Sequence, residues 1–174
     1  AIINNAGRIQ GRVNFSGLTG NVVFNNTSGL SWHTTGASSF SPGADTLNNA
    51  AGGVIYTNAG GVATSWDFLG GADTFTNAGT LVVGEPTLAA SALTISNLEA
   101  WNNSGTVVFG SSGTTASDLA ADDKILSAGT TFTGSGASKL VMDANLGALV
   151  QTSCAVLNGA DCLSLVGGNT AGST

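Results

Sequence analysis

A short phrase, an asparagine followed by a small residue and glycine, recurs along the chain, each time before residues that favour β-strands. Examples are NNAGRIQGRVNF, NNAAGGVIY and NNSGTVVFG, and the last asparagines of the phrases are Asn5, Asn26, Asn49, Asn58, Asn77 and Asn103. Four of the five intervals between them lie between 19 and 26 residues, and the short one before Asn58 indicates two phrases in one turn. Such a period is typical of a solenoid, in which each turn of chain forms one structural unit.

The segments after the phrases alternate between apolar and polar or small residues. Ile9, Val13 and Phe15 share one face of the first segment. Alternation with a period of two predicts strands that pack one face inside and expose the other. The further residues expected to point inward are Val62, Thr64, Trp66, Phe68, Leu93, Ile95, Leu140, Met142, Leu163 and Leu165.

The composition supports the same fold class. The 174 residues include 26 glycines, and only 8% are charged, compared with roughly 25% in a typical soluble domain. The surfaces of amphipathic helices need Glu, Lys and Arg, and this chain has too few of them for many helices. We therefore predict an all-β protein with few or no helices.

These features together predict a parallel β-helix that spans residues 1–174 as a single repeat segment, with about seven or eight rungs. In such a coil, like residues stack about 4.8 Å apart and form ladders. Asparagine tolerates left-handed backbone and can bond to the asparagine above it, whereas glycine allows tight corners. The expected corner residues are Asn5, Asn26, Asn49, Asn77, Asn103, Gly7, Gly79 and Gly105.

The phrases NAGTLVVG, NNSGTVVFGSSG and GADTFTNAG resemble the passenger domains of bacterial autotransporters, the type V secreted surface proteins. The resemblance covers nearly the whole chain through its repeat style, and the tail ADCLSLVGGNTAGST is similar to the C-terminal end of such passengers. It implies a right-handed β-helix, part of a longer passenger, that crosses the outer membrane and is exposed at the cell surface. It also implies a structural or adhesive stalk that presents loops and rung faces to host-cell, matrix or neighbouring-cell surfaces.

Two other functions remain open from the sequence. Unpaired strand edges at the end rungs could stack between molecules and form filaments. A polysaccharide-degrading enzyme is the other alternative, but adjacent carboxylates such as Asp122 and Asp123 point to opposite faces of a strand and cannot act as an acid and base pair. We therefore expect no enzyme, and a solvated loop around Asp122, Asp123 and Lys124.

Cys154 and Cys162 are the only cysteines. In an exported chain, two cysteines predict a disulfide. This bond would staple a loop within the last rungs, residues 150–174, and would stabilise the fold by about 2.5 kcal/mol in the chain-entropy model. A CxxC motif is absent, and two thiols alone make a poor zinc site.

The charge balance limits the partners. The formal net charge is −6, and the four basic residues, Arg8, Arg12, Lys124 and Lys139, are scattered. Because nucleic acids and anionic membrane surfaces attract clustered positive charge, neither is expected as a partner. No apolar run approaches the roughly 18 residues of a membrane-spanning helix, so we expect no direct membrane insertion of this segment.

The sequence predicts no metal or cofactor site. GADTL and GADTF resemble half of a calcium-binding repeat, but calcium needs tandem loops, so we expect Asp45 and Asp73 to cap turns by bonds to the backbone. His33 is expected to face solvent without a partner. The alternation places Trp66 and Phe68 in the core, where they cannot form a sugar-binding platform.

A flat ice-binding face is also not expected from the sequence. Such a face needs a Thr-x-Thr phrase on successive rungs. We identify one phrase of this kind, at Thr131 and Thr133, and it is not repeated on neighbouring rungs.

Overall fold

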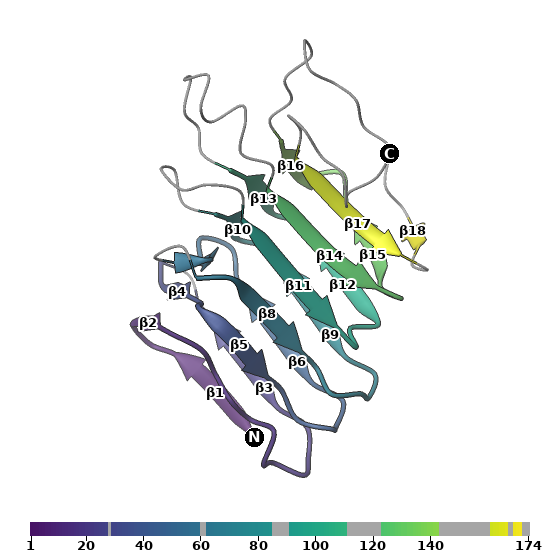
Figure 1. Cartoon of the computed structure of the whole chain (residues 1–174). Helices are drawn as coiled ribbons and strands as arrows, with labels where there is room; N and C mark the ends of the chain where they lie inside the picture. Colours follow the sequence, from purple (N-terminus) through teal and green to yellow (C-terminus); the bar gives the residue numbers. More distant parts are fainter. Residues whose placement is uncertain are drawn as a thin grey trace.

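The structure is a computed structural model and describes residues 1–27, 29–59, 62–84, 91–110, 123–142, 161–166 and 169–171. These residues form short strands and turns and contain no α-helix. The strands belong to three sheets, and all the pairings within each sheet are parallel (Figure 1).

Sheet A has seven strands: β1 (Ile2–Asn5), β3 (Val23–Asn26), β6 (Thr46–Asn49), β9 (Thr74–Asn77), β12 (Ala100–Asn103), β15 (Thr131–Gly134) and β18 (Asn169–Ala171). Sheet B has six: β2 (Arg8–Gln10), β4 (Ser31–His33), β7 (Val54–Thr57), β10 (Thr80–Val83), β13 (Thr106–Phe109) and β16 (Lys139–Val141). Sheet C has five: β5 (Gly36–Ser39), β8 (Thr64–Asp67), β11 (Ala92–Ser96), β14 (Lys124–Ala128) and β17 (Cys162–Val166).

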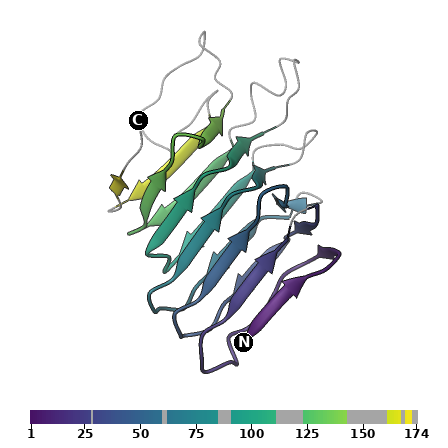
Figure 2. The same ribbon diagram turned by 180° about the vertical axis from the view of Figure 1, so that it is seen from behind.

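The chain passes through sheets A, B and C in turn and then starts the next rung, so that β6, β7 and β8 form one turn and β9 begins another. The predicted parallel β-helix is therefore confirmed, and the seven strands of sheet A agree with the expected number of rungs. Rung lengths along sheet A are 21, 23, 28 and 26 residues between successive corner asparagines. The strands β1 and β18 lie at opposite ends of the stack (Figures 1 and 2).

Aromatic side chains fill much of the interior. Trp32 and Trp66 stack with their ring centroids 5.6 Å apart, and Phe40 and Phe68 stack at 4.3 Å. Such pairs contribute about 0.5–1.5 kcal/mol each beyond the burial of their surface. The largest fully buried side chains are Trp32, Trp66, Trp101, Phe24, Phe40, Phe68, Phe75, Phe109, Leu47, Ile55, Leu81 and Leu93. The predicted inward positions of Trp66, Phe68, Leu93 and Ile95 are confirmed.

Three of the predicted inward residues are exposed. Val62 is 49% exposed because it lies in the turn before β8, where the alternation has not yet begun. Leu140 and Met142 are 44% and 41% exposed. The strand β16 pairs only with β13, so within the described part of sheet B no strand covers its other side.

The predicted staple near the C-terminus falls partly outside the described residues. Cys154 and the rest of the segment 143–160 are not described, so the disulfide stays a prediction. Cys162 begins β17, is 7% exposed, and donates its backbone N–H to the Asp123 carbonyl at 2.9 Å.

Candidate functional site

The corner between sheets A and B is built on a column of buried asparagines. The Nδ2 of Asn5 donates to the Oδ1 of Asn26 at 2.8 Å, and the same bond links each asparagine to the next, as far as Asn77 to Asn103 at 2.7 Å. We call this column the inner ladder; its members are Asn5, Asn26, Asn49, Asn77 and Asn103. Each Nδ2 also donates to a backbone carbonyl, such as that of Thr80 from Asn49 at 3.1 Å. The inner ladder therefore satisfies buried polar groups and holds successive corners in register.

Glycines stand beside the inner ladder, and they are not equivalent. A Cβ added at Gly79 would lie 2.2 Å from the carbonyl oxygen of Gly53. A Cβ added at Gly105 would lie 2.1 Å from the carbonyl oxygen of Gly79. The rungs thus approach closely at these two positions, and only glycine fits. An added Cβ at Gly7 meets nothing within 4 Å, so the corner of the first rung does not require glycine on steric grounds.

A second column, of acids, precedes the strands of sheet A. The backbone N–H of Asp45 donates to Oδ1 of Asp73 at 2.6 Å, and the N–H of Asp73 donates to Oε2 of Glu99 at 2.7 Å. Asp45 itself accepts from the N–H of Val22 at 2.7 Å and from that of Ser41 at 2.6 Å. The sequence predicted that Asp45 and Asp73 cap turns by bonds to the backbone: Asp45 does so through the N–H of Ser41, whereas the bond from Asp45 to Asp73 links two rungs. The sequence did not identify Glu99. The signal for Glu99 was its position directly before a strand.

Burial raises the pKa of Asp73 from 3.8 to about 6, and the nearby Glu99 and Asp45 charges add to this effect, while the N–H of Asp45 opposes it. A pKa that is higher in the folded state means that stability falls as pH rises from about 4 to about 6. We expect the free energy of unfolding to fall by at most about 3 kcal/mol over this range because of Asp73. Urea unfolding at a series of pH values measures this loss.

The variant D73N should remove this pH dependence, because the amide oxygen still accepts from Asp45 but carries no charge. The variant D67N, which changes a half-buried acid on β8 and keeps Asp73, should retain the wild-type slope. Equal slopes in wild type and D73N would contradict the assignment.

The expected solvated loop around Asp123 is wrong for that residue. Asp123 is 3% exposed, and its Oδ1 accepts from the N–H of Ser91 at 2.6 Å. Its own N–H donates to Oδ1 of Asp161 at 3.2 Å. Because Asp123 directly precedes β14, its carboxylate repeats at the start of sheet C the role that Asp45 has in sheet A. Asp122 lies outside the described residues.

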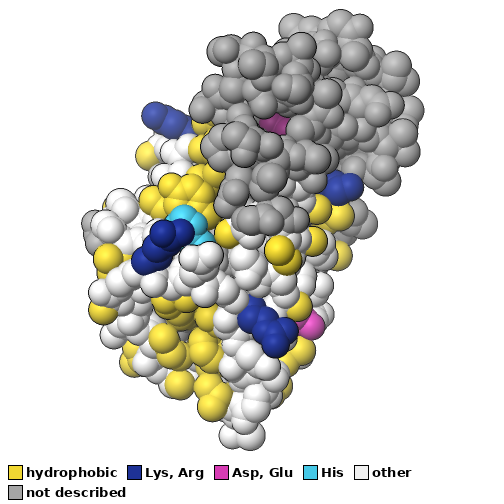
Figure 3. Space-filling model, turned by 60° about the vertical axis from the view of Figure 1, so that its left-hand side comes forward, with side chains coloured by type: hydrophobic (Ala, Val, Ile, Leu, Met, Phe, Trp, Pro, Cys, Tyr) yellow, Lys and Arg dark blue, Asp and Glu magenta, His cyan; other side chains and the backbone are white. Residues whose placement is uncertain are grey.

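The expectation that His33 is unpartnered is also wrong. Its ring stacks on Tyr56 of the next rung with centroids 4.5 Å apart and planes 26° from parallel. The register of sheet B causes this contact, because His33 pairs with Tyr56 on the outer face. The histidine is visible at the surface next to a basic side chain and hydrophobic atoms (Figure 3).

Buried oxygens without partners occur at the corner between sheets B and C. The hydroxyls of Thr34 and Thr57 and the side-chain oxygen of Asn58 have no hydrogen-bond partner. Thr64 at the same corner is satisfied, because its Oγ1 accepts from the N–H of Asn58 at 2.8 Å and donates to the Thr34 carbonyl at 3.2 Å. Thr57 pairs in register with Val83 of the next rung, so a valine already occupies the equivalent position there.

We expect T57V to leave the free energy of unfolding unchanged or to raise it by about 1 kcal/mol, because the variant removes a buried, unsatisfied hydroxyl and keeps the shape. T64V, which breaks two hydrogen bonds at the same corner, should lose about 1–2 kcal/mol. Thermal and urea unfolding of both variants measure the difference. A large loss in T57V would show that its hydroxyl binds an internal water.

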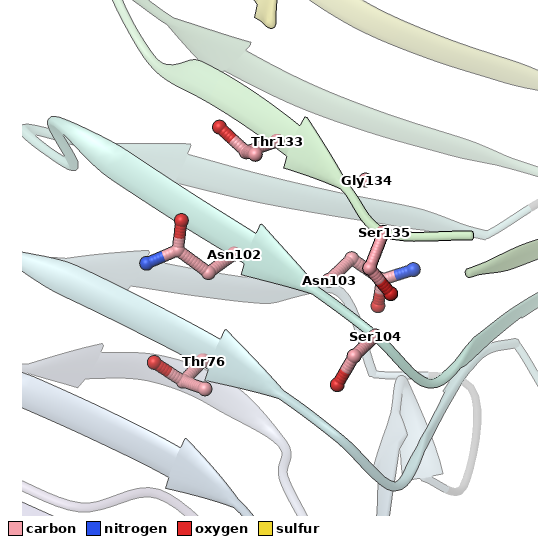
Figure 4. A pocket seen from close by; sticks show the side chains of 7 residues that line it. All are labelled: Thr76, Asn102, Asn103, Ser104, Thr133, Gly134 and Ser135. Carbon is pink, nitrogen blue, oxygen red and sulfur yellow. The ribbon is translucent and has the colours of Figure 1, made fainter. Parts of the chain in front are cut away.

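A shallow hollow of about 160 Å³ opens where sheet A turns toward sheet B. Three successive strands contribute Thr76, Asn102, Asn103, Thr133 and Gly134 to its lining, and the turns contribute Ser104 and Ser135 (Figure 4). Gly134 pairs in register with Asn103, so it occupies the place where the inner ladder would have its next asparagine. This hollow, whose accessible lining is mainly apolar with hydroxyl and amide groups beside it, is the candidate binding site of the described residues.

Within the described ranges, no group of three or more His, Cys, Asp or Glu residues could hold a metal ion, and no helix is long and apolar enough to cross a membrane. No family model, curated protein or solved structure matches this chain.

Proposed function

We propose that this chain is an extracellular structural and adhesive β-helix, the stalk segment of a surface-exposed autotransporter passenger. The observation that carries the proposal is a continuous stack of rungs whose outer faces are ordered and bear few charges. Such a stack places the same face at regular intervals along a rod, which suits the presentation of a surface to many partner molecules. The resemblance of the corner phrases to passenger repeats supports export to the cell surface.

The fold also suits export through a membrane. Strands pair with their counterparts in neighbouring rungs, 21 to 38 residues away along the chain. A solenoid of this kind can fold rung by rung, because stability comes from contacts between neighbouring repeats. A disulfide between Cys154 and Cys162 would be compatible with an oxidising location outside the cytosol.

The test is binding of the labelled, purified chain to whole bacterial and host cells, together with negative-stain microscopy over a concentration series. Discrete short rods that bind cells, with an unrelated protein of similar net charge as the negative control, would support the adhesive role. Long filaments without cell binding would overturn it in favour of self-assembly through the end rungs. Surface labelling of intact source cells with an antibody to the chain tests the proposed location.

A further inference from the structure

The outer face of sheet A has no charged side chain from β1 to β15. Its residues are exposed or half-buried and form two columns in register: Ile2, Val23, Thr46, Thr74, Ala100 and Thr131 in the first, and Asn4, Asn25, Asn48, Thr76, Asn102 and Thr133 in the second. The expectation of a single Thr-x-Thr phrase is wrong, because Thr74 and Thr76 form a second one on β9, but Ala100 and Asn102 on β12 separate it from the phrase on β15. The face is therefore polar, neutral and repetitive along the rod.

The second column has a threonine, Thr76, in the place that asparagines occupy in the three preceding rungs. Below it, the asparagines bond to one another: Nδ2 of Asn25 donates to Oδ1 of Asn4 at 2.8 Å, and Nδ2 of Asn48 donates to Oδ1 of Asn25 at 2.9 Å. Asn102 is exposed, lies between two threonines in register, and its side chain forms no hydrogen bond with any residue that the structure describes. Its amide donor and acceptor therefore remain available to a ligand at the edge of the hollow.

The lining of the hollow selects the chemistry of that ligand. Most of the accessible lining is apolar surface, to which the methyl groups of Thr76 and Thr133 belong, and hydroxyls and side-chain amides provide donors and acceptors beside it. An anionic ligand has no positive charge to pair with on this face, and a purely apolar ligand would leave the amide of Asn102 unsatisfied. A cavity of about 160 Å³ is smaller than a drug-sized pocket and suits a single small ring.

We propose that the hollow at Asn102 binds one sugar ring of a neutral polysaccharide, whose neighbouring units lie along the second column of sheet A. Amide and hydroxyl side chains pair with sugar hydroxyls without any charge, and the repeat of the column allows several weak contacts to add up along one chain. This inference deepens the proposed adhesive role and rests on it, because it names the chemical class of the surface that the stalk would contact.

The test is retention of the purified chain on insoluble neutral glucan, mannan and chitin, followed by titration with soluble oligosaccharides of the retaining polymer. N102A and T133V should each weaken binding by about tenfold, equal to about 1.4 kcal/mol of binding free energy. T94A is the control, since Thr94 is exposed on the outer face of β11 in sheet C, away from both columns of sheet A, and the variant should bind within about twofold of wild type. Circular dichroism should show that all three variants fold.

Three outcomes would overturn the inference. They are no retention of wild type on any neutral polymer, retention on anionic polymers alone, and equal effects of N102A and T94A. Whole-cell binding of the same preparations separates the two proposals: wild type that binds cells but no neutral glycan contradicts the sugar site and leaves the adhesive role standing. If the chain inhibits ice growth and binds no glycan, the inference is overturned, and the threonines of this face order water molecules instead of binding sugar.

Discussion

The variant N77A is expected to lose about 2–4 kcal/mol of unfolding free energy. Asn77 lies in the middle of the inner ladder, where its Nδ2 donates to Oδ1 of Asn103 at 2.7 Å and to the Thr106 carbonyl at 3.3 Å. Its Oδ1 accepts from Nδ2 of Asn49 at 2.8 Å. Alanine would leave the Asn103 oxygen buried without this donor and would open a cavity at a fully buried position.

Urea unfolding followed by far-ultraviolet circular dichroism measures this loss. N102A is the matched control, because Asn102 precedes Asn103 on the same strand but points to the opposite, exposed face. It should change stability by less than about 0.5 kcal/mol. Equal losses in the two variants would mean that the inner ladder contributes no more than any surface asparagine.

The inner ladder could be predicted because its residues repeat with the rung. Each member of the inner ladder is the last residue of a four-residue strand, so a period of 21 to 28 residues was enough to place them at one corner. The sequence could not show that the column ends at Gly134, because no asparagine phrase marks that rung. The hollow brings together residues of three rungs, so it becomes visible only once the register of β12 with β9 and β15 is known.

The acid columns were harder to predict for a different reason. Asp45, Asp73 and Glu99 occupy equivalent positions, but they differ in side-chain length and lie outside the asparagine phrases. Asp123 directly precedes β14 of sheet C, so predicting its burial required knowing where β14 begins. His33 was placed on the correct face, yet its partner Tyr56 lies 23 residues further along the chain and is set by the pairing of β4 with β7.

The variant G79A is expected to destabilise the fold by about 3 kcal/mol or more. The new Cβ would lie 2.2 Å from the Gly53 carbonyl oxygen and 2.5 Å from that of Ala50, and both atoms belong to the backbone of the rung below. The N–H of Thr80 donates to the same Gly53 carbonyl at 2.9 Å, so the two rungs cannot separate without stretching a bond between sheet strands. Relief of the clash therefore requires a change in the stacking of two corners.

The variant G7A gives the matched comparison, since Gly7 stands at the same corner of the first rung in open space and without a left-handed backbone. Alanine there should be neutral or raise the unfolding free energy by up to about 1 kcal/mol, because it restricts the unfolded chain. Thermal unfolding of the two variants side by side tests the pair. A mild effect of G79A would show that the rungs are spaced more widely at this corner than the close contact implies, and the inner ladder alone would then set the register.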